Sequence, residues 1–191
     1  MGCDKASLVI DGSPLISHVV HSLLLAGSES VLIRVRDVDD VARLSFLLAG
    51  VEVDWSLDDP AHPGMLHALR GSLEVGRDRG WDAVQLAAVD TPYVQPELFM
   101  GLTALMEGGC DAAVPTTLSA QDSASDGLEP LLACLRIEPA LRALEALGAD
   151  DLRVTKIFDA LDSITVGPQL WSTWGVEERC FWNLNRPEDL K

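Results

Sequence analysis

Short apolar runs alternate along this chain with longer segments in which apolar residues recur every three or four positions. The longest run, residues 82–89, consists mainly of small and branched apolar residues and leads directly into Asp90-Thr91-Pro92. Such a run is typical of a parallel strand that is covered on both faces. Since proline lacks the N–H group that a strand ladder needs, we expect this strand to end at about Asp90.

The other apolar runs predict further strands at residues 30–35, 51–55, 111–115, 131–135 and 163–166. Helical spacing predicts helices at residues 14–26, 37–50, 96–108, 139–147 and 153–161, and another that begins at Pro63-Gly64. Ser13 is the expected N-cap of the first helix, with Pro14 at its first helical position. Residues 116–128 form a long polar loop, a candidate substrate flap.

Strands that alternate with helices predict an α/β fold with three layers and a mostly parallel central sheet. A chain of 191 residues fits one domain, which we expect to span residues 1–191. About half of the residues, 48%, are hydrophobic, so a sizeable core is available. No internal repeat interrupts this pattern.

The net charge limits the kinds of partner that the protein is expected to bind. The formal net charge is −16, and only three residues (Lys5, Lys156 and Lys191) are lysines. A field of this sign repels polyanions, which argues against nucleic acid and against an anionic membrane surface as partners. A nucleotide ligand would therefore need a local cation or a metal ion.

The cysteines and the hydropathy of the chain indicate the cellular compartment in which the protein is expected. Four cysteines (Cys3, Cys110, Cys134 and Cys180) are widely spaced and form no C-x-x-C pair, which is typical of buried thiols in a reducing compartment. No apolar stretch reaches the length of a membrane span, and the first residues do not resemble a signal peptide. We expect a cytoplasmic protein.

Asp90 is the first candidate for chemistry. In open α/β sheets ligands bind beyond the carboxyl ends of the strands, where a carboxylate commonly holds a divalent metal against a phosphate. The alternative is that Asp90 caps the following turn or helix. Lys5 precedes a short turn and a helix start, so its ammonium could neutralise nucleotide phosphates; the alternative is a solvated surface lysine.

Several motifs occur in an order that resembles the molybdenum cofactor guanylyltransferases, a MobA-like family of nucleotidyltransferases. They are Met1-Gly2-x-Asp4-Lys5-Ala6, Gly12-x-Pro14-Leu15, Pro63-Gly64, Asp90-Thr91-Pro92-Tyr93 and Asn183-x-Asn185-x-Pro187-Glu188-Asp189. The resemblance spans nearly the whole chain and implies a Rossmann-like nucleotidyltransferase fold. It also implies transfer of GMP from GTP to molybdopterin with Mg²⁺. Expected partners are GTP, molybdopterin or the molybdenum cofactor, other cofactor-maturation proteins and apo-molybdoenzymes.

The resemblance also implies roles for individual residues. Asp90 would be the magnesium ligand and Lys5 the cation on the nucleotide phosphates. Asp58 or Asp59 would lie near the guanine, with the alignment open by one residue. Asn183 and Asn185 would lie near the pterin phosphate and the metal, where neutral amides favour the guanylyl branch. The alternative for these asparagines is a pair that bonds to the backbone at a strand end.

The chain also departs from the family pattern. The family begins with a buried strand and a glycine-rich loop, L-x-G-G-x-S-x-R, before the segment that this chain starts with. That loop provides backbone N–H groups for phosphates, and loss of the strand would expose two ladders and a slot in the core. Arg34, Arg36 and Glu129 also stand where the family often has other residues. Two alternatives stay open: another nucleotidyltransferase, such as a cytidylyltransferase, or a non-catalytic truncated homologue.

Overall fold

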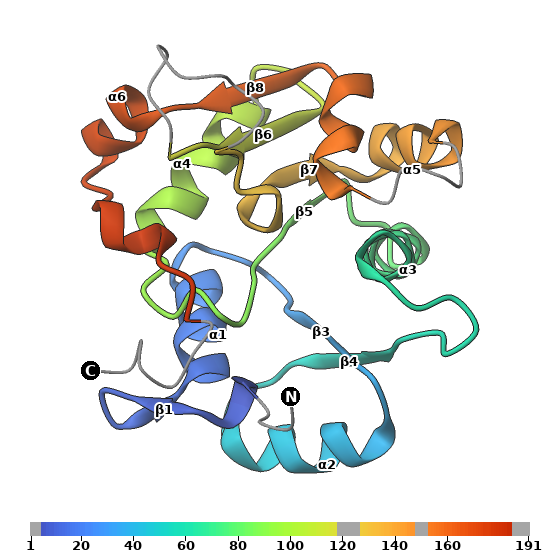
Figure 1. Ribbon diagram of the computed structural model, residues 1–191, viewed down its shortest axis with the longest axis vertical. Helices are drawn as coiled ribbons and strands as arrows, with labels where there is room; N and C mark the ends of the chain where they lie inside the picture. The colour runs from blue at the N-terminus through green and yellow to red at the C-terminus, as the bar shows by residue number, and fades with distance from the viewer. Residues whose placement is uncertain (1–4, 118–126, 148–152, 185–191) are drawn as a thin grey trace.

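The computed structural model describes residues 5–117, 127–147 and 153–184 of the protein (Figure 1). Its helices are α1 (Leu15–Leu25), α2 (Val38–Leu47), α3 (Met65–Asp78), α4 (Pro96–Met106), α5 (Ile137–Ala146) and α6 (Pro168–Trp171). Its strands are β1 (Val9–Ile10), β2 (Ser13–Pro14), β3 (Leu32–Val35), β4 (Asp54–Leu57), β5 (Ala83–Gln85), β6 (Ala112–Pro115), β7 (Cys134–Arg136) and β8 (Ser163–Val166). The predicted α/β class is confirmed.

Strands β5, β7, β6 and β8 form a four-stranded sheet in that order. β8 lies parallel to β6, whereas β7 runs antiparallel to both of its neighbours, β5 and β6. β3 and β4 form a separate parallel pair, and β1 and β2 form a small hairpin. Within the described residues β3 and β5 are therefore edge strands that no ladder joins.

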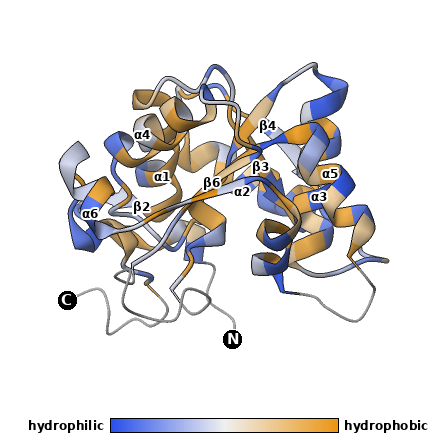
Figure 2. Ribbon diagram, turned by 90° about the horizontal axis from the view of Figure 1, so that it is seen from above, coloured by the Kyte–Doolittle hydropathy of each residue, from blue (hydrophilic) through white to orange (hydrophobic). Residues whose placement is uncertain are grey.

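Two clusters of buried side chains hold these layers together. One joins α1 and α4 to the sheet and includes Val20, Phe99 and Leu102; the other joins α3 and α5 and includes Leu73 and Leu135. Seen from above, α1 and α4 are mostly hydrophobic, whereas α3 and α5 on the other side combine hydrophobic and hydrophilic stretches (Figure 2). Within the described residues, no helix combines the length and apolar character needed to cross a membrane.

Most predicted elements are present, with some differences in their ends. The strand expected up to Asp90 is shorter, because β5 ends at Gln85. One more backbone hydrogen bond follows, from Leu86 N to Ala133 O just before β7, and the chain then leaves the sheet. Pro14, predicted as the first helical residue, is instead the N-cap of α1, because Ser13–Pro14 pairs in the hairpin. The helix expected over residues 153–161 is a 3-10 helix, Val154–Ala160. Most of the predicted polar loop, and Asn185, lie outside the described residues.

The cysteines that the structure describes are buried thiols, as predicted: Cys110, Cys134 and Cys180. Burial raises the pKa of Cys134 and of Cys180 to about 11. An unfolded chain releases these protons at about pH 8.5, so above that pH the unfolded state binds fewer protons than the folded state. We expect the free energy of unfolding to fall between pH 9 and 11 by about 1.4 kcal/mol per pH unit for each thiol.

Urea titrations at several pH values would measure that slope. The matched control is the double variant Cys134→Ala/Cys180→Ala, in which the loss of stability between pH 9 and 11 should be much shallower. An unchanged slope in the double variant would show that other groups cause the effect.

Candidate active site

Lys5 and Asp90 meet although 85 positions separate them in the sequence. The Lys5 Nζ donates to Asp90 Oδ2 at 3.0 Å, and both side chains remain partly exposed, at 37% and 24%. Lys5 begins the 3-10 turn Lys5–Ser7 ahead of β1, and Asp90 lies in the turn that follows β5. The structure therefore places a cation and a carboxylate, each predicted independently, in direct and solvent-accessible contact.

Asp90 lies in a turn, and its side chain is partly exposed. Thr91, which is only 1% exposed, closes this turn: its Oγ1 donates to Ala88 O at 2.8 Å. The N-cap of the next helix is Gln95, five residues further on. Within the described residues Asp90 thus does not cap α4, which removes the capping alternative for that helix.

Asn183 reaches the same place from the carboxyl end of the chain. The backbone N–H of Leu184 donates to Asp90 O at 2.8 Å, which fixes Asn183 beside the Asp90 turn with an exposed side chain. The nearby Tyr93 and Trp182 rings meet edge to face, 6.4 Å apart between centroids. Three predicted site residues, Lys5, Asp90 and Asn183, therefore come together.

The structure gives Asp58 and Asp59 different partners, which the sequence alone could not determine. Asp58 Oδ1 accepts from Arg34 Nε at 3.0 Å, and Arg34 is further fixed by Nη1–Ser56 Oγ (3.2 Å) and Nη2–Leu57 O (2.9 Å). Arg34 is among the residues that line the same cavity as Asp90. Asp59 instead bonds to His62 in an exposed loop, and this hydrogen bond lowers the pKa of the Asp59 carboxyl. Asp58 is the one connected to the cavity.

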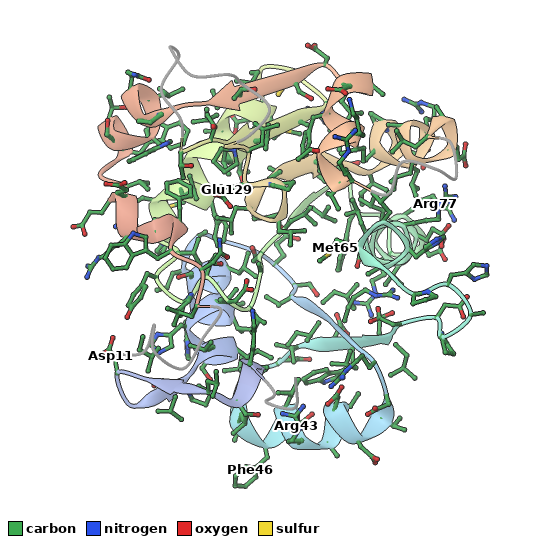
Figure 3. All side chains as sticks on the ribbon, in the orientation of Figure 1. Asp11, Arg43, Phe46, Met65, Arg77 and Glu129 are labelled. Carbon is green, nitrogen blue, oxygen red and sulfur yellow. The ribbon has the colours of Figure 1, made fainter. Side chains whose placement is uncertain are left out.

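Glu129 is a charged residue to which sequence reasoning gave no role. Its backbone N–H donates to Pro115 O at 2.9 Å, which anchors the segment before β7 at the end of β6 (Figure 3). Burial, and then the negative charge of Asp90, raise the pKa of the Glu129 carboxyl. Its only sequence signal was Glu129-Pro130 at a position where the family often has His-Pro.

The residues at Asp90 suit a magnesium ion better than a metal held by protein alone. The described residues contain no group of three or more His, Cys, Asp or Glu side chains that could hold a metal. Mg²⁺ typically binds through one or two carboxylates and completes its shell with water and substrate phosphates. A single partly exposed carboxylate beside a lysine fits that pattern, and Asp90 would be the residue that holds the ion.

Comparison with known proteins identifies the family. The model of the MobA-like NTP transferase domain matches residues 1–164. The chain belongs to this family. It is therefore a nucleotidyltransferase with the Rossmann-like fold that the motifs implied.

Individual relatives agree with this assignment. The chain is similar to proteins named molybdenum cofactor guanylyltransferase from Burkholderia ambifaria (28% identity over 191 residues, 99% of this chain and 86% of the relative) and from Cereibacter sphaeroides (29% over 189 residues, 99% and 86%). Among solved structures, molybdopterin-guanine dinucleotide biosynthesis protein A from Archaeoglobus fulgidus superimposes with a TM-score of 0.74 at 24% identity, over 99% of this chain and 88% of that one. 4-Diphosphocytidyl-2C-methyl-D-erythritol synthase from Anaerococcus prevotii shares the fold (TM-score 0.72, 12% identity, 95% and 85%).

Proposed function

We propose that this chain is a magnesium-dependent molybdenum cofactor guanylyltransferase, which transfers GMP from GTP to molybdopterin. The observation that carries the proposal is the meeting of Lys5, Asp90 and Asn183 from three distant parts of the chain. The names of the curated relatives supply the substrate class. The related guanylyl and cytidylyl reactions need the same minimal set of groups, so competition between GTP and CTP distinguishes them.

In the proposed reaction a phosphate oxygen of molybdopterin attacks the α-phosphorus of GTP. A new P–O bond forms while the bond to the bridging oxygen breaks, and pyrophosphate leaves with that electron pair. Catalysis of this kind depends on positioning and on compensation of the charge that develops on the phosphates. When bound, Mg²⁺ would polarise the α-phosphate and shield its charge.

The residues of this chain would then act as follows. The Lys5 ammonium, held 3.0 Å from Asp90, is a compact positive charge for the phosphates of GTP. The Asp90 carboxylate would hold the metal. The neutral side-chain amide of Asn183, exposed beside that turn, can donate a hydrogen bond to the phosphate of the pterin without adding a negative charge. Arg34 and Asp58 would face the base.

Competition between GTP and CTP tests the proposal. We expect Mg²⁺-dependent binding of GTP to this protein to be about tenfold or more tighter than binding of CTP, because a site that hydrogen-bonds one base leaves polar groups unpaired with another. Isothermal titration calorimetry with each nucleotide, with Mg²⁺ and with EDTA, measures this difference. Tighter binding of CTP would favour a cytidylyltransferase, and absence of Mg²⁺-dependent binding of either nucleotide would favour a non-catalytic homologue.

A further inference from the structure

The turn that carries Lys5 is short and lies against helix α2. Lys5–Ser7 is a 3-10 turn of three residues, and the two-residue strand β1 follows it. Leu8 N donates to Lys5 O at 3.0 Å, and Ala6 is buried in the cluster that joins α1 and α4 to the sheet. Hydrogen bonds within a 3-10 turn have poorer geometry than those of an α-helix. Contacts with neighbouring elements therefore help to set the position of Lys5.

Arg43 of α2 makes a side-chain contact with this turn. Its Nη1 donates to Ser7 Oγ at 2.5 Å, across 36 positions of sequence. Arg43 extends from α2 toward the body of the protein, whereas Phe46, three residues further on, points away from it (Figure 3). Ser7 ends the turn whose first residue, Lys5, forms the ion pair with Asp90. The Arg43 guanidinium thus holds one end of the turn that presents the Lys5 ammonium.

A carboxylate on the same helix fixes the orientation of Arg43. Arg43 Nη2 donates to Asp40 Oδ1 at 2.5 Å, and Arg36 Nε lies 3.5 Å from Asp40 Oδ2. The Asp40 side chain is only 14% exposed, and the hydrogen bond from Arg43 lowers the pKa of its carboxyl. Asp40 is therefore negatively charged at neutral pH. Because a guanidinium is a rigid plane, binding of one nitrogen to Asp40 also directs the nitrogen that binds Ser7.

We propose that Arg43 is a positioning residue, which holds the Lys5 turn so that the Lys5 ammonium stays beside Asp90. The inference rests on the proposed function, in which Lys5 binds the phosphates of GTP. A lysine has a flexible stem, so the position of its charge depends on where its backbone is held. Displacement of a reacting group by about 1 Å can lower a rate by about a hundredfold. Arg43 would act on the nucleotide through Lys5.

Attraction of the nucleotide by the charge of Arg43 alone is the competing explanation. The Arg43 side chain is 37% exposed in a chain with a formal net charge of −16, so its charge is accessible to solvent. Ser7→Ala separates the two explanations, because it removes the hydroxyl that Arg43 binds and leaves the charge in place. Positioning predicts that Ser7→Ala and Arg43→Met have the same kind of effect, whereas charge alone predicts no effect of Ser7→Ala.

The NMR signals of lysine Nζ test the proposal on the protein without ligands. The chain contains only three lysines, so labelling lysine with ¹⁵N gives few signals, and the Lys5 signal is the one that Lys5→Met removes. We expect Asp90→Asn to shift this signal, because its partner loses the negative charge. Arg43→Met and Ser7→Ala should shift it in the same direction, because a loosened turn lowers the population of the ion pair.

Binding of GTP with Mg²⁺ tests the consequence for the proposed function. We expect Lys5→Met to weaken binding about tenfold or more, the effect of losing a hydrogen bond to a charged group. Arg43→Met and Ser7→Ala should each weaken it about threefold to tenfold. In the double variant Lys5→Met/Arg43→Met, the second substitution should add less than about twofold, because residues that act through one another are not additive. Isothermal titration calorimetry measures each affinity.

The matched control is Arg77→Met. Arg77 lies on α3 with a side chain that is 49% exposed, and its contact to Asp78 is a surface pair, so this variant loses the same charge away from the site. Its Lys5 signal and its affinity for GTP should equal those of the parent protein. Circular dichroism checks that the variants fold. Ser7→Ala removes no charge, so it tests the proposal even if Arg43→Met does not fold.

Three results would overturn the proposal. A Lys5 signal that neither Arg43→Met nor Ser7→Ala shifts would show that Arg43 does not hold Lys5. Weak GTP binding by Arg43→Met with normal binding by Ser7→Ala would show that charge alone is responsible. Losses that multiply in the double variant would show that Arg43 does not act through Lys5.

Failure of the proposed function gives a different result. If Lys5→Met binds GTP as tightly as the parent protein, the proposed role of Lys5 at the phosphates is wrong, and the positioning role of Arg43 falls with it. The Lys5 signal would then still shift in Arg43→Met and Ser7→Ala, which distinguishes this case from a failure of the contact between Arg43 and the Lys5 turn.

Discussion

Asp90→Asn is expected to lower guanylyl transfer about a hundredfold to a thousandfold, and with it Mg²⁺-dependent binding of GTP, while leaving the fold intact. The amide keeps the size of the side chain but removes the negative charge that would hold the metal, and losses of this order follow removal of one electrostatic contact to a transition state. The Lys5–Asp90 pair is partly exposed, so its loss should change the free energy of unfolding by less than about 1 kcal/mol. Release of pyrophosphate from GTP with molybdopterin measures turnover.

The matched control for this variant is Asp78→Asn. Asp78 ends α3 with a side chain that is 73% exposed, and its contact to Arg77 is a surface pair. The Asp78→Asn variant makes the same change of charge as Asp90→Asn, but away from the site, and should keep the activity of the parent protein. Activity of Asp90→Asn at the level of Asp78→Asn would show that Asp90 does not hold the catalytic metal.

Phe99→Ala should destabilise the protein by about 3–5 kcal/mol, the range found when a buried aromatic ring is removed from a core. Phe99 lies on α4 with 1% of its surface exposed, in the cluster that joins α1 and α4 to the sheet. Globular domains are stable by only about 5–15 kcal/mol, so this loss is a large part of the total. Urea unfolding followed by circular dichroism measures it.

Met100 provides the control at the next position of the same helix. Its side chain is 53% exposed, so Met100→Ala should change the free energy of unfolding by less than about 0.5 kcal/mol. Similar losses in Phe99→Ala and Met100→Ala would contradict the packing described for α4.

The pattern of apolar residues predicted those helices and strands that have a regular apolar face. α1, α4 and β8 lie at or within a few residues of the predicted positions, because a regular apolar face defines each of them. The prediction made β5 too long, because small apolar residues continue to Val89, whereas the hydrogen bonds toward β7 end at Leu86. Residues 86–89 are only partly buried and form no strand, so the apolar run did not define where the strand ends.

The direction of β7 is a tertiary property. Residues 131–135 showed the pattern of a buried strand, but an apolar run reads the same for a parallel and an antiparallel neighbour. β7 lies between β5 and β6 and runs against both; the chain already runs antiparallel to the end of β6 at the Thr116–Leu128 bridge, ahead of β7. Only the packed sheet defines that order.

By itself the sequence determined the α/β class, the family, and the residue types at the site, because spacing and motif order are properties of a linear chain. It named Lys5 and Asp90 separately. Only the tertiary structure decided that they form a 3.0 Å pair, that Asn183 lies beside them, and that Asp58 is connected to the cavity through Arg34, whereas Asp59 bonds to His62. Each of these facts depends on distances between residues far apart in the chain, and such distances are set by how helices and sheets pack against one another.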